Sequence, residues 1–295
     1  MIETYLLEEL TVFAKTGTLT QTAAQLNVTQ PSVTRGMQKL EDEFGTRLFA
    51  RQANRIALTP AGELAAKEAA RLLQANSAMV TKVQNFDRSQ HTTILAATVP
   101  GPLILLRQLR ATLDTQLQLE DQFVATNDIE TALTNNQDSL IFSNQELLTD
   151  TIESQYVGEE RLQVNLDQFM YLANQATVTF DELKGLSFIV MRAIGPWSDI
   201  IKANIADAKF MYQDDREAFA EITAHSRFPF FATNLSQSEP TFDAQVKADT
   251  DRVAVPISDD SAQMPIYASY LLSQKQRLSP LIRQLQQQWP TTIQQ

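Results

Sequence analysis

The sequence predicts a multidomain α/β protein, in which a small helical unit is followed by one long helix and a larger α/β region. Apolar residues at helical spacing, punctuated by cap residues, occupy most of residues 1–58. A heptad-like spacing then runs unbroken from Ala65 to Phe86, and beyond residue 92 short apolar runs alternate with helical stretches. These patterns are typical of a helical domain, an interaction helix and an α/β domain. A chain of 295 residues is long enough for two or three domains.

Composition excludes several classes of protein. The sequence has no apolar run of about 18 residues, which a membrane-spanning helix needs. The opening "MIETYLLEEL" is acidic and lacks the basic segment of a signal peptide. With no cysteine there is no disulfide framework and no thiolate metal site. We therefore expect a soluble cytoplasmic protein with no membrane partner and no cofactor or metal.

The charge is unevenly distributed along the chain. Residues 1–90 hold ten Lys and Arg against nine Asp and Glu, for a net charge of +1. Residues 91–295 hold fourteen against twenty-six, for −12, and together these give the −11 of the whole chain. An acidic body with a near-neutral, locally basic head keeps a protein soluble without repelling a polyanion from the head. Nucleic acid therefore stays open as a partner.

The first sixty residues predict three helices and a hairpin. The first helix ends at Gly17 and the second closes at Asn27, both of which are helix-stop signals. The third begins at Thr29, an N-cap residue, and tolerates Pro31 in its first turn, where the missing N–H has no helical partner. It ends at Gly45. Its predicted buried stripe, at spacings of four, three and four, consists of Val33, Met37, Leu40 and Phe44.

Polar side chains are concentrated on the first turns of the third helix. In a helix-turn-helix the second of the two helices enters the major groove by its N-terminal residues, where short polar side chains and an arginine reach base edges or phosphates. "TRLFARQANRIALT" predicts a hairpin with Arg51 and Arg55 on its flanks, where a wing would meet DNA. The alternative is a solvated amphipathic helix. The polar residues of the helix are Gln30, Ser32, Thr34 and Arg35.

A long helix is predicted from Thr59, as N-cap, and Pro60 to about Arg88. Its apolar positions recur at spacings of four and three, which is a coiled-coil seam. Pairing with a second copy of the chain is the favoured interpretation, and packing on the chain's own body is the alternative. The seam consists of Ala65, Ala69, Leu72, Asn76, Met79, Val83 and Phe86, of which Asn76 could fix the register.

Beyond the polar segment 88–93, strand-like and helix-like runs alternate in β-α-β-α-β order, which predicts an open, mostly parallel α/β sheet. The strand-like runs are "TILAATV", "LQLEDQFV" and "SLIFS", and the helical ones are "PLILLRQLRATLD" and "DIETALTNN". A second unit of the same kind runs from "RLQVNLD" to "KFMYQ". "RVAVPIS", "PIYASYL" and a final helix "LSPLIRQLQQQW" close the chain.

The head resembles the N-terminal winged helix-turn-helix of LysR-type transcriptional regulators. The elements "GTLTQTAAQLNVTQPSVTR", "LEDEFGTRLFAR" and "LTPAG" stand in order, and the resemblance is specific over about residues 3 to 65. It implies binding to double-stranded DNA as a homodimer, assembled further into a homotetramer, with the long helix forming an antiparallel pair. By matching position, the contacts to DNA fall on Gln30, Pro31, Ser32, Thr34, Arg35 and Arg51, to which the hairpin pattern adds Arg55.

The resemblance also implies a two-lobed α/β effector domain of the periplasmic-binding-protein kind. The expected domains are the winged helix-turn-helix over 1–58, the dimerisation helix over 59–88 and the effector domain over 89–295. Within the last, lobe I takes about 92–160 and 265–295 and lobe II about 161–264, with crossings near Gly158–Gln163 and Ser261–Pro265. A small-molecule effector would bind between the lobes. The candidate effector contacts are Thr98, Asn127, Ser143, Arg192 and Ser226.

Ser226 lies in a departure from the family pattern, "AHSRFPFFATNLS", where bulky aromatic residues replace small ones. These residues either line a pocket for an apolar or aromatic effector or fill the cleft. We therefore expect a LysR-type regulator of transcription controlled by a small molecule. The alternative is a DNA-binding regulator whose effector domain has lost its ligand and only mediates oligomerisation. An enzyme is not expected, since the chain has two histidines and no Gly-x-Ser-x-Gly, P-loop or Gly-x-Gly-x-x-Gly motif.

Overall fold

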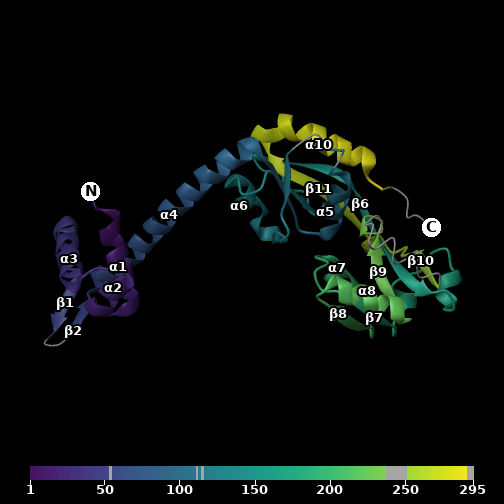
Figure 1. Ribbon diagram of the computed structural model, residues 1–295, viewed down its shortest axis with the longest axis horizontal. Helices are drawn as coiled ribbons and strands as arrows, with labels where there is room; N and C mark the ends of the chain where they lie inside the picture. Colours follow the sequence, from purple (N-terminus) through teal and green to yellow (C-terminus); the bar gives the residue numbers. More distant parts are fainter. Residues whose placement is uncertain (53–54, 111, 114–115, 237–250, 291–295) are drawn as a thin grey trace. The chain divides into compact units, whose positions relative to one another are not determined.

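The computed structural model describes the chain from Met1 to Pro290, apart from residues 53–54, 111, 114–115 and 237–250 (Figure 1). The side chains of residues 51, 52 and 55 are likewise outside the description. The chain divides into two compact units, Met1–Gln84 and Asn85–Gln295, which we call unit 1 and unit 2 and describe separately.

Unit 1 holds three helices in a helix-turn-helix arrangement followed by a hairpin, as predicted. In the turn between the second and third helices, Asn27 has a φ of 54°, a left-handed conformation that Asn tolerates better than most residues. Thr29 caps the third helix, because its side chain accepts a hydrogen bond from Ser32 N at 3.3 Å. The elements are α1 (Thr4–Thr16), α2 (Leu19–Gln25), α3 (Gln30–Phe44), β1 (Phe49–Gln52) and β2 (Arg55–Leu58).

An apolar core joins these elements. Leu6 of α1 and Val33 and Leu40 of α3 are fully buried, and the ring of Phe13 meets the ring of Phe49 edge-on at 5.5 Å between centroids. Burial of each such side chain contributes about 1.5–3 kcal/mol. The prediction that Phe44 belongs to this buried stripe is wrong: its side chain is exposed, since α3 ends at this residue and the chain turns away at Gly45.

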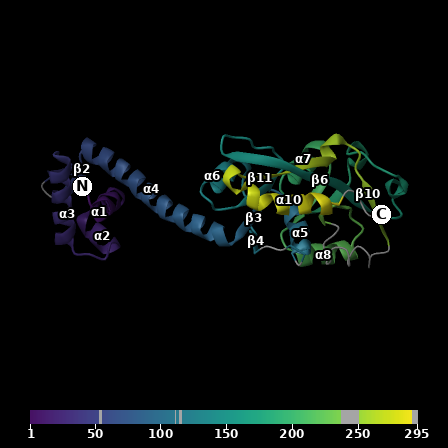
Figure 2. The ribbon, with the colours of Figure 1, turned by 90° about the horizontal axis from the view of Figure 1, so that it is seen from above.

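The long helix α4 (Pro60–His91) is continuous (Figure 2) and extends one turn past the predicted end at Arg88. Its start is as predicted, because the Thr59 hydroxyl accepts a hydrogen bond from Gly62 N at 3.0 Å. This capping satisfies one of the backbone donors that the first turn of a helix leaves without a partner.

Unit 2 is built on a mixed sheet that holds nine strands within the described residues. They run in the order β4-β3-β5-β11-β6-β9-β7-β8, with β10 also paired to β6. The parallel pairing expected of the β-α-β units is found for β3 with β4 and β5 and for β7 with β8 and β9. The sheet as a whole is mixed, because β6 pairs antiparallel with β9, β10 and β11 and β5 does so with β11. The strands are β3 (Thr93–Ala97), β4 (Leu117–Leu119), β5 (Leu140–Ser143), β6 (Ile152–Asp167), β7 (Ser187–Met191), β8 (Lys209–Gln213), β9 (Phe230–Thr233), β10 (Arg252–Pro256) and β11 (Gln263–Leu271).

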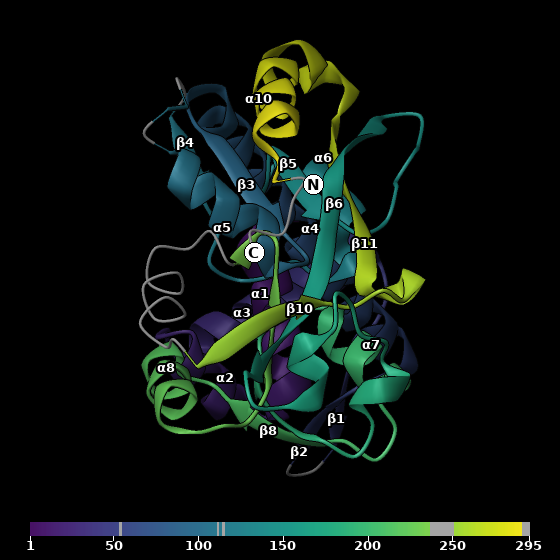
Figure 3. The same cartoon turned by 90° about the vertical axis from the view of Figure 1, so that its right-hand side faces the viewer.

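Strand β6 runs without interruption through both halves of unit 2 (Figure 3). Residues 152–161 pair with β11, in the half that also holds β3, β4 and β5, which we call the β3 half. Residues 162–167 pair with β9 and β10, in the half that also holds β7 and β8, which we call the β7 half. The chain thus crosses between halves by a change of partners within one strand. The sequence predicted only its second part, "RLQVNLD", as a strand.

Helices are found in both halves of unit 2. The final helix packs on β6 and β11 (Figure 2).

The segment "LQLEDQFV" is predicted as a strand, but only residues 117–119 pair. No helix of the described residues is long and apolar enough to cross a membrane. The helices of unit 2 are α5 (Pro100–Leu109), α6 (Ile129–Thr134), α7 (Trp197–Asn204), α8 (Arg216–His225) and α10 (Lys275–Gln288).

Candidate functional site

The first two turns of α3 present a polar surface. Gln30, Pro31, Ser32 and Arg35 are exposed, and Thr34 is half-buried. The hydroxyl of Thr34 donates to the carbonyl of Gln30 at 3.0 Å, which orients its methyl group and oxygen along the helix. On the opposite side, residues of the buried stripe fix α3 in the core of unit 1. The predicted polar residues are therefore brought together on one exposed, rigidly supported face.

Lys39, further along the same helix, is engaged within the chain. Its ammonium group lies 2.5 Å from the carboxylate of Glu3, and both side chains are about half exposed. The hydrogen bond with Glu3 raises the pKa of Lys39 and lowers that of Glu3. The pair ties the end of the chain that precedes α1 to the outer part of α3.

A buried carboxyl group lies beneath α3. Glu9 of α1 is 5% exposed, and its Oε2 has no hydrogen-bond partner among the described residues. Burial raises the pKa of this carboxyl to about 7. The carboxyl fits only because residue 36 is glycine: a Cβ there would collide with it. Sequence patterns pointed to neither residue, since Glu9 stands in a helix rich in acidic residues.

The hairpin is joined to α3 by a carboxylate. Oε1 of Glu41 accepts hydrogen bonds from the backbone N–H groups of Leu48 and Phe49, at 2.8 and 3.0 Å. Within the hairpin Arg51 is opposite Ile56, in the antiparallel register β1–β2. The side chains of Arg51 and Arg55, predicted to contact DNA, lie outside the described residues.

The predicted seam of α4 divides into two parts. Ala65 and Ala69 are buried in the core of unit 1, so they pack on the chain's own head. Further along, four apolar seam residues are between 54% and 64% exposed, and Asn76 between them is exposed as well. An apolar row of this kind on one helix is costly to leave in water. The exposed apolar seam residues are Leu72, Met79, Val83 and Phe86.

Unit 2 contains a cleft of about 540 Å³, walled by residues of both its halves. This is within the range of volumes that small-molecule sites occupy. The β3 half contributes the first turns of α5, and the β7 half contributes the start of α7, α8 and the end of β9. The wall includes the apolar residues Leu103, Ile104, Trp197, Phe219 and Phe231, and the charged residues Arg107, Asp121, Glu160, Asp214 and Arg216.

Glu160 of β6 is the buried charge of this cleft. Its side chain is 1% exposed, and its Oε1 accepts a hydrogen bond from the hydroxyl of Thr233 at 2.7 Å. Burial raises the pKa of Glu160 to about 7, opposed by Thr233 and by the nearby indole of Trp197. Its Oε2 has no hydrogen-bond partner among the described residues. Gly101, in the first turn of α5, leaves room for the carboxyl, because a Cβ at this position would collide with it.

None of the five predicted effector residues is among the residues that line the described cleft. Thr98 is buried at the end of β3, and Ser143 is buried and donates to the carbonyl of Gln145 at 2.7 Å. Asn127 is exposed. Arg192 forms an ion pair with Asp214 at 2.6 Å. The loops that hold Thr98 and Arg192 nevertheless reach the wall, through Pro100 and Ile194.

Sequence reasoning missed Glu160, although a signal was present. Leu162, Val164 and Leu166 alternate along β6 on its apolar face, and the same alternation extended backward by one step reaches residue 160. A carboxylate on that face is unexpected in a purely structural strand, because burying it without a partner is costly.

The aromatic segment "AHSRFPFFATNLS" lines the cleft rather than filling it. Phe231 is part of the wall, whereas the neighbouring Phe230 is not, and its ring meets the wall residue Phe219 edge-on at 5.7 Å between centroids. The guanidinium of Arg252 fixes the segment by donating to three carbonyl groups at 2.5–2.9 Å, among them that of Ser226. Ser226 therefore helps to hold this loop in place through its backbone carbonyl.

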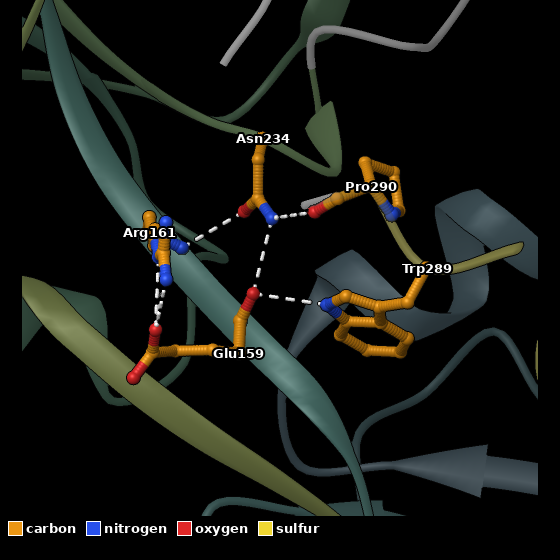
Figure 4. Close-up of polar contacts among 5 residues, drawn as sticks. All are labelled: Glu159, Arg161, Asn234, Trp289 and Pro290. Atoms are coloured by element: carbon orange, nitrogen blue, oxygen red, sulfur yellow. Dashed lines mark hydrogen bonds and ion pairs between the residues drawn. The ribbon is translucent and has the colours of Figure 1, made fainter. Parts of the chain in front are cut away.

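A polar cluster joins the two halves where β6 changes partners (Figure 4). The amide of Asn234 accepts from Arg161 N at 2.8 Å and donates to the carbonyls of Glu159 and Pro290, at 3.0 and 2.8 Å. The indole of Trp289 donates to the same Glu159 carbonyl at 2.9 Å. We call residues 289–290, which follow α10, the C-terminal strap. The strap thus bonds directly to both β6 and the residue after β9.

Comparison with known proteins identifies the class. An uncharacterized HTH-type transcriptional regulator, YxjO of Bacillus subtilis (strain 168), is 28% identical over 153 residues, or 50% of this chain and 53% of the relative. The match therefore spans about half the length of that relative. The fold is that of DarR from Vibrio fischeri, solved in complex with DNA, at a TM-score of 0.61, 18% identity and coverage of 97% and 99% of the two chains. Full-length OxyR from Pseudomonas aeruginosa gives a TM-score of 0.52, 16% identity and coverage of 100% and 99%.

Unit 1 thus holds a helix-turn-helix with a hairpin, and an α/β unit lies beyond α4. Residues 6–63 match the family model described as bacterial regulatory helix-turn-helix protein, lysR family. The match covers the head of the chain, the same part whose sequence resembles the LysR family.

Proposed function

We propose that this chain is a sequence-specific, DNA-binding regulator of transcription that acts in the cytoplasm. The observation that carries the proposal is the exposed polar start of α3 within the segment that matches the LysR helix-turn-helix model. In this arrangement Gln30, Ser32, Thr34 and Arg35 reach base edges in the major groove, while the positive end of the α3 dipole favours a phosphate. Pro31 and the wing residues Arg51 and Arg55 complete the proposed surface.

Dimerisation through α4 is the second part of the proposal. The exposed row Leu72, Met79, Val83 and Phe86 would be covered by the same row of a second copy in an antiparallel helix pair. Ala65 and Ala69 belong to the head, so the pairing surface begins beyond them. Dimers would associate further into tetramers, each dimer presenting two α3 helices to major grooves about 34–36 Å apart.

Ligand control is the third part. The cleft of about 540 Å³, with a buried carboxyl group in its wall, supports binding of a small molecule between the halves of unit 2. In the competing proposal, unit 2 binds no ligand and only mediates assembly of the oligomer. A regulatory rather than catalytic role is supported by the matched relative, itself a transcriptional regulator. Within the described residues no group of three or more His, Cys, Asp or Glu residues could hold a metal ion.

Footprinting tests the proposal. The purified chain is incubated with the DNA that flanks its own gene, at low and at moderate salt, with and without a metabolite extract. We expect protection over several helical turns, weakened by salt because phosphate contacts release counterions, and altered by the extract. Protection that the extract never alters would favour the assembly-only role. No protection of this DNA or of a random pool of duplexes at low salt would overturn DNA binding.

A further inference from the structure

Two polar side-chain atoms in the cleft wall, Oε2 of Glu160 and Nε1 of Trp197, form no hydrogen bond of regular geometry with the described residues. The indole is nevertheless close enough to the carboxyl to lower its pKa. Both side chains are almost fully buried, at 1% and 2% exposure. Buried polar groups are normally hydrogen-bonded, and leaving one unpaired is costly. Unpaired atoms in the wall of a cavity therefore mark where the polar group of a ligand binds.

The charges of the wall favour a cation. The wall carries two arginines and three carboxylates, and Arg192 pairs with one of these carboxylates, so the preference depends on where the charges lie and not on their sum. Near the solvent, Arg107 pairs with Asp121 at 3.1 Å and Asp214 pairs with Arg192 at 2.6 Å. Glu160 has only neutral polar neighbours, the Thr233 hydroxyl and the Trp197 indole, among the groups that act on its pKa. The described cations thus leave the innermost carboxyl without a countercharge.

The rest of the wall is apolar. Its apolar residues include Leu103 and Ile104 of α5 and Trp197, Phe219 and Phe231 of the β7 half. Such walls bind apolar bodies, and aromatic rings add favourable edge and face contacts. The cleft therefore matches a ligand that is apolar over most of its surface and carries one compact polar group.

We propose that the cleft binds a small amine, with an aromatic or aliphatic body against Phe219 and Phe231 and a protonated amino group that donates to Oε2 of Glu160. The inference rests on the proposed ligand control and names the class of its ligand. An ammonium group brings both the countercharge and the donors that the carboxylate lacks. A carboxylic acid would instead place a second negative charge beside Glu160.

The pH dependence of binding follows from the same contact. Burial raises the pKa of Glu160 to about 7, so the carboxyl is ionised above this pH and protonated below it. Because the amine pairs with the ionised form, its apparent dissociation constant should be about tenfold larger at pH 6 than at pH 8. The other charged groups of the wall, Arg107, Asp121, Asp214 and Arg216, are exposed to solvent.

Isothermal titration calorimetry of the full chain separates the ligand classes with three probes of similar size: 2-phenylethylamine, 2-phenylethanol and 3-phenylpropanoate. At pH 8 we expect the amine to bind at least about tenfold more tightly than the alcohol, and the acid not to bind. Glu160→Gln should remove the preference for the amine and flatten its pH dependence. Asp181→Asn, an exposed carboxylate paired with Lys184 away from the cleft wall, should preserve both.

Three results would overturn the proposal: no binding of the amine, equal or tighter binding of the acid, or an amine affinity that Glu160→Gln leaves unchanged. The probe series and its pH dependence use the unaltered chain, so they are decisive even if the variant folds poorly. Footprinting of the same preparation distinguishes the two levels of inference. If the chain protects DNA but does not bind the amine, only the proposed ligand class is refuted. If it does not protect DNA, the proposed function itself is refuted.

Discussion

The indole of Trp289 lies directly against the backbone of Gly158 in β6, so closely that a Cβ on residue 158 would come within 2.5 Å of three ring atoms. The glycine therefore provides the space in which the C-terminal strap rests. The neighbouring residue of β6, Glu159, accepts the indole N–H, so contact and hydrogen bond act together. This places the C-terminal strap at the point where β6 passes from one half of unit 2 to the other.

We expect Gly158→Ala to destabilise unit 2 by about 1–3 kcal/mol, because the added methyl group must displace a packed indole ring. Urea unfolding followed by circular dichroism measures the loss. Trp289→Leu serves as the control background. In this variant the indole ring is absent, so Gly158→Ala should lower the free energy of unfolding much less. Additive effects of the two changes would show that the methyl group clashes with something other than the indole.

Glu9 should make the stability of unit 1 depend on pH. Its folded-state pKa of about 7 lies above the ordinary value of 4.5, so burial favours the neutral form. The stability linked to this group is fully present below pH 4.5 and is lost as pH rises through 7. We expect Glu9→Gln to raise the free energy of unfolding by about 2–3 kcal/mol more at pH 8 than at pH 5. An equal effect at both pH values would mean that the carboxyl is solvated.

Arg35 should contribute to specific DNA affinity. If it reads a guanine, Arg35→Ala weakens binding to the footprinted site by about 1–3 kcal/mol and relaxes specificity at one base pair. Fluorescence anisotropy with the site and with its single-base variants measures both effects. Arg71→Ala removes an exposed arginine of α4 that pairs with Glu68, and it should leave affinity nearly unchanged. Unaltered specific affinity of Arg35→Ala would exclude the role.

Leu72→Glu and Met79→Glu should each convert dimers to monomers, because two copies of a charge would be buried in an antiparallel helix pair. Sedimentation velocity measures the change in mass. Gln74→Glu adds the same charge to α4 at an exposed position outside the apolar row, so it should remain dimeric. Dimers that persist in both seam variants would place the interface elsewhere.

Local signals predicted the local structure. Thr29 and Thr59 cap the helices as expected, and the spacing of the apolar residues defined the core of unit 1 except at Phe44. That exception arises because helical spacing gives the face of a residue but not whether the neighbouring elements reach it. Pairing in unit 2 was less predictable. Whether β6 meets its partners parallel or antiparallel depends on residues about a hundred positions away.

The candidate DNA surface could be predicted from sequence because its residues are adjacent on one helix. The cleft could not, since its wall collects α5, β6, α7, α8 and β9 from distant parts of the chain. Thr98 and Arg192 belong to segments that reach the cleft, but Thr98 is buried and Arg192 pairs with Asp214. Glu160 and Gly101 depend on one another, and a pair of this kind is visible only once the fold brings them together.

The unbroken course of β6 determines how the two halves of unit 2 can move. Domains that close about a ligand usually bend at a few loop residues, whose backbone angles absorb the change. Here the connection at residues 161 and 162 lies inside a hydrogen-bonded ribbon. A rotation between the halves would therefore add twist to β6 at this crossing, and residues 257–262, between β10 and β11, form a second connection. Glu159 bonds to the strap and the next residue, Glu160, lines the cleft. Twisting of β6 at this point would therefore move the strap and the cleft together.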